Sequence, residues 1–368
     1  MTWSVDAELE DALWAAARAR IPQELHGGPG LSAAVVDRSR RYTSDRDHLA
    51  APASATADLA ARALFFTIAD AAKIRVPLAE LAARGLDPRD RIRVLDVGAG
   101  CGAMTLGIIA HVAPGTSIDA ALIDRDEQAL AIAADAIRAY AAARGVTIAV
   151  TTRRADVSAI PSGTFDLVVA GSVVNELPPP ARARMVERML EATASAGATI
   201  VIEPALKSTA RDLHAVRDDL LARGVAHVFA PCTRQVARCP MLDTDRDWCH
   251  EDRPLQLPPR AMRIAINTGL RDAGMKMSYL VLRHMTEPLV PAGALARRVV
   301  SEPMKSKGKL ELYGCSDEGR LKLRLLQRNR TDANRAFERA RRGDVLVGIG
   351  GTEVDPDEDV GRITPAGD

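Results

Sequence analysis

The chain has 368 residues, a formal net charge of +1 and 47% hydrophobic residues, so it is long enough for one large α/β domain with appendages or for two domains. No apolar run is long enough to span a bilayer, and the acidic start lacks the apolar core of a signal peptide. We therefore expect a soluble, cytoplasmic protein without membrane contact, and most simply a monomer. In that setting its five cysteines favour metal binding, catalysis or burial over structural disulfides.

Residues 1–88 are expected to form an N-terminal helical region. Apolar residues recur at helical spacing over 3–20, 54–74 and 76–84, and the glycine- and proline-rich residues 27–30 follow the end of the first helix. Such a region either packs on a sheet as a lid or faces a substrate as a platform, and the sequence leaves both interpretations open.

The strongest local signal is the run Ile-Arg-Val-Leu-Asp-Val-Gly-Ala-Gly-Cys-Gly-Ala at residues 92–103, where a buried parallel strand ends in an acid and alternating glycines. Glycines allow a tight turn and the close approach of a ligand. A dinucleotide-binding fold requires G-x-G-x-x-G, with its acid about twenty residues further on. The pattern here, D-x-G-x-G-x-G, instead resembles motif I of the class I S-adenosylmethionine-dependent methyltransferases. That resemblance implies cofactor contacts from Asp96, Gly98, Ala99, Gly100 and Gly102.

Expected strands and helices alternate over residues 89–288, which predicts an α/β fold with right-handed crossovers. We expect a seven-stranded, Rossmann-like sheet of the class I methyltransferase type. Its final two strands are separated by an insertion, residues 231–275, where a tight hairpin is usual. The expected strands are 92–97, 117–123, 146–152, 165–170, 198–203, 224–230 and 276–283.

Polar residues follow three of these strands at their carboxyl ends. Asp124 ends the second strand, where a carboxylate accepts the ribose hydroxyl protons in a doubly wound sheet, whereas Asp126 is the alternative or caps the next helix. Methyltransferases of this class place a polar residue near the adenine amino group after the third strand, and Asp156 has that position. After the fourth strand, Asn175 and Glu176 are available to position a methyl acceptor or to cap the next helix.

Cysteines are concentrated in the insertion. The gaps between them are too wide for the C-x-x-C knuckle of common zinc ribbons, and three thiolates still lack a fourth ligand, which a later cysteine on a glycine-flanked turn can supply. Four thiolates suit an iron-sulfur cluster, with tetrahedral zinc as the alternative and His250 as a substitute ligand. We expect Cys101, inside the glycine turn, to fill a buried gap. The candidate metal ligands are Cys232, Cys239, Cys249 and Cys315.

These cysteines and their neighbours resemble the methyltransferase-like assembly-factor family of the mitochondrial small ribosomal subunit, which has bacterial members. The resemblance implies a class I methyltransferase domain, association with small-subunit ribosomal RNA during assembly, and a [4Fe–4S] cluster on the four candidate cysteines. Two segments depart from the family pattern: Pro204-Ala205 replaces Arg-Gly after Glu203, and Glu251 replaces Phe after the Cys-His pair. The matching segments are Pro231-Cys232, Cys239-Pro240-Met241, Asp247-Trp248-Cys249-His250, residues 278–282, and Cys315 with Gly319.

The C-terminal part is expected to be a small, basic, β-rich module at residues 289–350. Residues 297–342 hold fourteen Lys or Arg against six Asp or Glu, a charge asymmetry typical of contact with nucleic acid. Residues 351–368, rich in Gly, Pro and acids, predict a disordered tail. Exposed cations placed to follow RNA phosphates are Lys322, Arg324, Arg328 and Arg330.

The functional hypothesis is an iron-sulfur-containing, S-adenosylmethionine-binding methyltransferase, or methyltransferase-like factor, acting on small-subunit ribosomal RNA. The segment after the fourth strand lacks the Asn/Asp-Pro-Pro-aromatic motif of amino-group base methyltransferases and the Pro-Cys of cytosine-C5 enzymes. The acceptor atom is therefore unassigned. Two alternatives stay open: a non-catalytic small-subunit assembly factor, and a small-molecule methyltransferase with a zinc-stapled lid.

Overall fold

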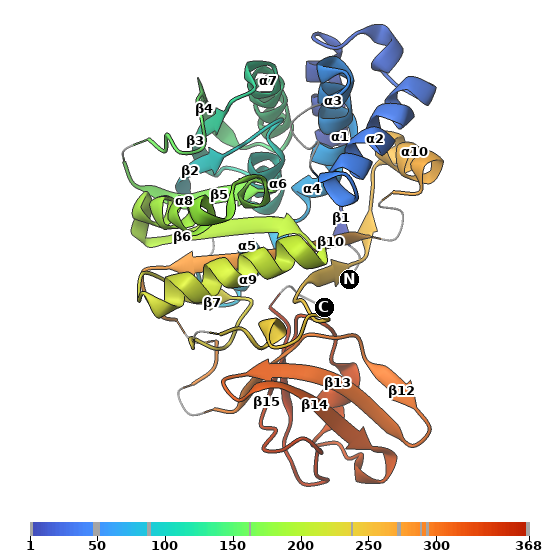
Figure 1. The fold of residues 1–368 in the computed structure, drawn as a ribbon, viewed down its shortest axis with the longest axis vertical. Helices are drawn as coiled ribbons and strands as arrows, with labels where there is room; N and C mark the ends of the chain where they lie inside the picture. Colours follow the sequence, from blue (N-terminus) through green and yellow to red (C-terminus); the bar gives the residue numbers. More distant parts are fainter. Residues whose placement is uncertain are drawn as a thin grey trace.

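The computed structural model describes residues 3–46, 52–86, 90–161, 163–236, 238–270, 274–287, 289–291 and 294–365. Figure 1 shows a central sheet with helices on both faces and, at the C-terminal end of the chain, a smaller β-rich module. Among the described helices, none combines the length and the apolar character needed to cross a membrane.

The central sheet has the strand order β4-β3-β2-β5-β6-β10-β7. Strands β2 to β6 run parallel, whereas β10 runs antiparallel to both β6 and β7. This order confirms the expected seven-stranded Rossmann-like sheet, and the insertion adds an eighth strand, β8, beside β10. The strands are β2 (Arg91–Val97), β3 (Ser117–Asp124), β4 (Thr147–Arg154), β5 (Phe165–Gly171), β6 (Thr193–Pro204), β7 (His227–Ala230), β8 (Glu251–Arg253) and β10 (Met275–Arg283).

Each face of the sheet has its own apolar core. Alternate side chains of a strand point to opposite faces, so Ile92 and Val94 of β2 join one core, whereas Leu95 and Val97 join the other. The first core packs against α6 (Ala103–His111), α7 (Glu127–Ala143) and the N-terminal helices. The second packs against α8 (Pro179–Glu191) and α9 (Lys207–Ala222). Burial on both faces explains why these strands are nearly continuous apolar runs.

The N-terminal region contains one helix that we did not expect. Residues 27–30 also begin a helix, because Gly28 and Pro29 are the first two residues of α2. A proline is tolerated there, since the N–H groups of the first helical turn have no partner within the helix. The expected helix over 54–74 contains a π-helical turn, η3. Strand β1 (Trp3–Ser4) pairs with β9 (Leu255–Gln256) of the insertion, which also contains α10 (Pro259–Thr268). The helices of the N-terminal region are α1 (Ala7–Arg18), α2 (Gly28–Thr43), α3 (Ala55–Ala61), η3 (Arg62–Phe66), α4 (Thr67–Ala71) and α5 (Arg75–Ala82).

The C-terminal module has a sheet of order β12-β13-β11-β15-β16, with β14 beside β13, around its own apolar core. The expectation of a disordered tail from residue 351 is wrong for the described residues, since β16 pairs with β15 and Val354 and Val360 are buried in this core. Residues 366–368 of that tail lie outside the described residues. The elements are β11 (Ala296–Val299), β12 (Met304–Ser306), β13 (Lys309–Ser316), β14 (Gly319–Leu326), α11 (Arg335–Arg339), β15 (Val345–Val347) and β16 (Gly361–Ile363).

A buried ion pair joins this module to the rest of the molecule. Arg298 of β11 donates to both carboxylate oxygens of Glu80 on α5, at 2.7 and 3.2 Å, and to the Gly343 carbonyl. The Tyr279 hydroxyl of β10 donates to the same carboxylate at 3.0 Å. Glu80, Tyr279 and Arg298 are all buried. One carboxylate therefore links the N-terminal helices, the central sheet and the C-terminal module.

Substitution Arg298→Met should lower the free energy of unfolding by up to about 3–5 kcal/mol, because it removes the closer of the two arginines paired with the buried Glu80 carboxylate and leaves only Arg84, at 3.7 Å. Urea unfolding of the full chain measures this loss. The matched control is Arg324→Met, which breaks the exposed Arg324–Glu353 pair of the same module and should cost no more than about 1 kcal/mol. Equal losses in the two variants would show that the buried pair does not join the module to the sheet.

Candidate functional site

A cavity of about 540 Å³ opens at the carboxyl ends of β2, β3 and β5 and is covered by α2, α3 and α4. Six of the expected cofactor and acceptor residues line it. The other three, Asp96, Gly102 and Asn175, lie behind this lining. The six lining residues are Gly98, Ala99, Gly100, Asp124, Asp156 and Glu176.

The three glycines of the loop after β2 all have positive φ angles but meet different neighbours. A Cβ on Gly98 would lie 2.5 Å from Val173, and a Cβ on Gly102 would lie 3.1 Å from Ala133 on α7. By contrast, a Cβ on Gly100 would meet nothing within 4 Å. Gly98 and Gly102 thus permit close packing of the loop, whereas Gly100 presents bare backbone to the cavity, as a bound nucleoside requires.

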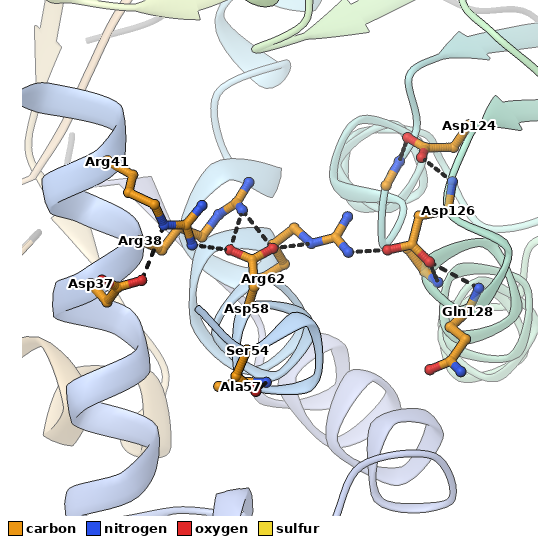
Figure 2. Close-up of polar contacts among 12 residues, drawn as sticks. Asp37, Arg38, Arg41, Ser54, Ala57, Asp58, Arg62, Asp124, Asp126 and Gln128 are labelled. Atoms are coloured by element: carbon orange, nitrogen blue, oxygen red, sulfur yellow. Dashed lines mark hydrogen bonds and ion pairs between the residues drawn. The ribbon is translucent and has the colours of Figure 1, made fainter. Parts of the chain in front are cut away.

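Asp124 fastens the glycine loop to the end of β3. Its carboxylate accepts the backbone N–H of Gly100 and that of Asp126, both at 2.8 Å (Figure 2). Asp126 caps α7 by accepting the N–H groups of Gln128 and Ala129. The capping alternative for Asp126 is therefore confirmed. Asp124 still borders the cavity, and each oxygen keeps a lone pair for a ribose hydroxyl.

Asp96 is buried at the end of β2, directly before the glycine loop. One carboxylate oxygen accepts the N–H and the hydroxyl of Thr105, at 3.2 and 2.7 Å, whereas the other has no hydrogen-bond partner among the described residues. Burial raises the pKa of Asp96 to about 6. A buried carboxylate with one oxygen free of hydrogen bonds within the described residues favours a cationic ligand nearby. Asp96 and the glycine loop therefore fit the sulfonium cofactor S-adenosylmethionine.

Asp156 lies on the cavity wall beyond the end of β4. Its carboxylate accepts the Ser158 N–H at 2.9 Å, and this hydrogen bond lowers the pKa of Asp156. The side chain is therefore an ionised acceptor, the chemistry needed opposite an exocyclic amino group.

Asn175 does not face the cavity. Its amide N–H donates to the buried Glu203 carboxylate at 2.6 Å, and its oxygen accepts from Arg46 at 2.8 Å. The same Glu203 carboxylate accepts the N–H groups of Val173 and Val174. Burial raises the pKa of Glu203 to about 7. Asn175 thus stabilises the loop after β5. Its amide oxygen and nitrogen form hydrogen bonds within the protein and are not directed at a methyl acceptor.

Glu176 does line the cavity, at its outer edge. It accepts the Tyr42 hydroxyl from α2 at 2.5 Å and lies 3.4 Å from the Arg125 guanidinium. Neither Asn175 nor Glu176 caps α8, which begins after Pro178 with no side-chain cap. Of the two expected acceptor residues, Glu176 alone is in position to meet an acceptor.

The N-terminal helices supply cavity residues that the sequence analysis did not identify. Three arginines surround Asp58 on α3, and Arg62 continues to Asp126 at the start of α7 (Figure 2). Burial alone would raise the pKa of Asp58, but the arginines outweigh it and hold the pKa below its usual range. The i, i+4 spacing of Asp58 and Arg62 was the available signal. These helices form the roof of the cavity; the three arginines are Arg38, Arg41 and Arg62.

A second, much smaller cavity of about 40 Å³ brings together all four candidate metal ligands, Cys232, Cys239, Cys249 and Cys315. None of them forms a disulfide. Burial, and then the neighbouring thiols, raise the pKa of Cys239 to about 12. Burial likewise raises the pKa of Cys315 to about 12 and that of Cys249 well above its usual value. The thiols of Cys239, Cys249 and Cys315 therefore favour the neutral form unless a cationic group lies beside them.

Polar groups hold the cysteine-bearing loop in place. The Cys249 N–H donates to Nε2 of His214 at 3.0 Å, and the Cys239 N–H donates to the Asp218 carboxylate at 2.7 Å. His250, the substitute ligand, borders the same cavity, and its Nδ1 is buried without a hydrogen-bond partner in the described part of the chain. Within that part, no three His, Cys, Asp or Glu side chains are arranged as ligands of one metal ion. Cys101 is buried within the glycine loop and lines the other cavity.

The expected basic face is partly neutralised by acids. Arg324 pairs with Glu353 at 2.7 Å, and Arg330 pairs with Glu338 at 3.1 Å. Lys322 and Arg328 are exposed, and the Lys322 ammonium lies 5.6 Å from the centre of the Tyr313 ring. Neighbouring acids thus reduce the positive charge of this surface.

Substitution Gly98→Ala should weaken S-adenosylmethionine binding by at least about tenfold, because the added Cβ collides with Val173 and displaces the loop. Isothermal titration calorimetry measures the change. Gly85→Ala is the matched control, because Gly85 has the same φ of +69° but nothing within 4 Å of an added Cβ. Similar affinities of Gly98→Ala and wild type would exclude this loop as the cofactor site.

Comparison with solved structures finds class I methyltransferases at low identity. Magnesium protoporphyrin IX methyltransferase from Synechocystis PCC 6803, with bound SAM, is 14% identical over 68% of this chain and 96% of its own, with a TM-score of 0.37. The plantazolicin methyltransferase BpumL, in complex with SAH, is 11% identical over 69% and 96%, with a TM-score of 0.38. A Listeria monocytogenes protein described as a class I methyltransferase is 13% identical over 77% and 90%, with a TM-score of 0.39. Because these scores are low, the fold assignment rests on the strand order.

No curated protein matches the chain. The sequence model of one family, described as the mitochondrial small ribosomal subunit Rsm22, matches residues 56–347. The matched region contains the glycine loop, the cavity residues after β3, β4 and β5, and all four clustered cysteines. This protein therefore belongs to the Rsm22 family.

Proposed function

We propose that the protein is an S-adenosylmethionine-dependent methyltransferase that acts on small-subunit ribosomal RNA during ribosome assembly. The observation that carries the proposal is the 540 Å³ cavity at the glycine loop, in a chain of a small-subunit ribosomal family. The loop at 98–102 and Asp96 would hold the cofactor, Asp124 the ribose and Asp156 the adenine amino group.

The chemistry proposed for this site needs little from the protein beyond orientation. When bound, S-adenosylmethionine supplies an electrophilic methyl group for in-line displacement. The protein contributes proximity and alignment, for which residues 173–175 are held by hydrogen bonds to the buried Glu203 carboxylate. Glu176 lies at the edge of the cavity, where it can orient an acceptor or accept its proton.

For the cysteine cavity we propose a structural [4Fe–4S] cluster on Cys232, Cys239, Cys249 and Cys315. Four thiols that face one small space, with no disulfide between them, support this assignment. Because Cys315 belongs to β13 and the other three to the insertion, such a cluster would join the module to the methyltransferase domain. Zinc, with His250 as a possible ligand, is the competing occupant.

One observation favours a second candidate, a non-catalytic assembly factor. Asn175 is engaged inside the protein and Glu176 is bonded to Tyr42 and lies beside Arg125, so no side chain of the loop after β5 is committed to an acceptor. In that case cofactor binding would stabilise or report the folded state. The Lys322 and Arg328 surface would still contact ribosomal RNA.

Methyl transfer from labelled S-adenosylmethionine to immature small subunits tests the choice between these candidates. We expect label in ribosomal RNA with the wild type and none with Asp96→Ala, which removes the buried carboxylate at the end of β2. Absence of transfer by an anaerobically prepared protein with its metal centre intact would favour the assembly factor. RNA binding that does not weaken with salt would argue against either ribosomal function and for a small-molecule acceptor.

Substitution Cys315→Ser should abolish the visible absorbance and the iron content of anaerobically purified protein, since a cluster loses affinity when one of its thiolates is removed. The unfolding midpoint should fall as well. Cys101→Ser is the control, because Cys101 lies outside the cysteine cavity, and it should keep both iron and absorbance. A colourless wild-type protein with one equivalent of zinc would overturn the cluster.

A further inference from the structure

Arg234, a buried cation of the cysteine-bearing insertion, has no acidic partner among the described residues. Its side chain belongs to a residue that is 8% exposed, and within the described part of the chain its guanidinium hydrogen-bonds only the Ser316 carbonyl oxygen, at 3.0 Å. Its Nε is buried without a partner among those same residues. A buried cation is costly unless a counter-charge and further hydrogen bonds offset the loss of water. The burial of Arg234 therefore indicates a negative group close by in the functional protein.

The other charged side chains around the cysteine cavity do not supply that group. His214 is neutral, because its Nε2 accepts the Cys249 N–H and is therefore unprotonated. The remaining charges are arranged in pairs of opposite sign. These pairs are Arg217–Asp218, Arg253–Glu251, Arg298–Glu80 and Arg320–Asp247. Within the described residues, the charge of Arg234 is thus left without compensation after these pairs have formed.

The contacts of Arg234 place its charge beside the thiols. Arg234 follows Cys232 by two residues, and the carbonyl that accepts its guanidinium belongs to Ser316, the residue after Cys315. Thr233, between Cys232 and Arg234, donates its hydroxyl to the Cys315 carbonyl at 3.3 Å. The Arg234 guanidinium accordingly interacts electrostatically with the Cys315 thiol. Thiolates of the cysteine cavity are therefore the nearest source of the negative charge that Arg234 lacks.

We propose that Arg234 is the counter-ion of a negatively charged metal–thiolate centre on the four clustered cysteines. The inference rests on the proposed metal centre and adds a positioning residue to it. Four thiolates exceed the 2+ charge of an oxidised [4Fe–4S] core or of a zinc ion, so either occupant leaves net negative charge in the cavity. Because the same guanidinium holds the Ser316 carbonyl of β13, it links the charge of the centre to the C-terminal module.

The reduction potential of the anaerobically purified full chain tests this assignment. Reduction adds an electron to a centre that is already negative, so loss of a nearby cation should make reduction harder. Arg234→Gln removes the charge but keeps a hydrogen-bond donor, and Arg234→Met is a second neutral variant of different shape. Both should shift the potential to more negative values and release iron to a chelator at least about tenfold faster than the wild type. Arg234→Lys keeps a cation and should stay close to the wild type in both measurements.

The matched control is Arg238→Met in the same loop, because Arg238 is exposed and pairs with Asp243, and it should change neither the potential nor the release of iron. An unchanged potential in the neutral variants, or the same shift in Arg234→Lys, would overturn the counter-ion role and leave the metal centre standing. For a wild type that holds zinc, the rate of zinc transfer to a chelator replaces the potential, with the same expected order of variants.

A wild-type protein with neither iron nor zinc would overturn the proposed metal centre and this inference with it. Far-ultraviolet circular dichroism verifies that each variant is folded.

Discussion

The buried carboxylate of Glu80 is the constraint on which the arrangement of the three parts of the molecule depends. It receives Arg298 from the C-terminal module and Tyr279 from the central sheet, while it belongs to a helix of the N-terminal region. Arg298 and Tyr279 also line the cysteine cavity. A single desolvated charge therefore sets both the position of the module and the shape of the space between the four thiols, because a buried ion must keep its partners.

The cavity at the glycine loop depends on a similar principle. Its floor is the glycine loop, which needs only local backbone freedom, but its roof is held by charges from helices far away in sequence. Asp58 gathers three arginines, and Arg62 extends this group to the cap of α7 (Figure 2). The roof thus contacts Asp126, two residues after Asp124 on the cavity wall. In the proposed function, ligand binding and the order of the N-terminal helices are coupled.

Much of the site was predictable, because its residues follow strands whose hydrophobic pattern is clear. The glycine loop, Asp124 and Asp156 border the cavity, and the capping alternative for Asp126 is confirmed. Asn175 was not assignable, since its orientation depends on Glu203, a residue of another strand. Lys73 could not be predicted as a cavity residue for a related reason. A lysine in a helical pattern is normally solvated, and only the packing of α4 on α6 buries this one at the cavity.

By itself, the sequence determined the α/β class, the positions of the sheet strands along the chain, the glycine loop and the identity of the four clustered cysteines, because each rests on local periodicity or on residue types. The tertiary structure decided which side chains face the cavity, which cations remain exposed on the C-terminal module, and that Val354 and Val360 complete its core. These features depend on contacts between segments distant in the chain. Burial and charge pairing exist only after those segments have packed, so no local pattern encodes them.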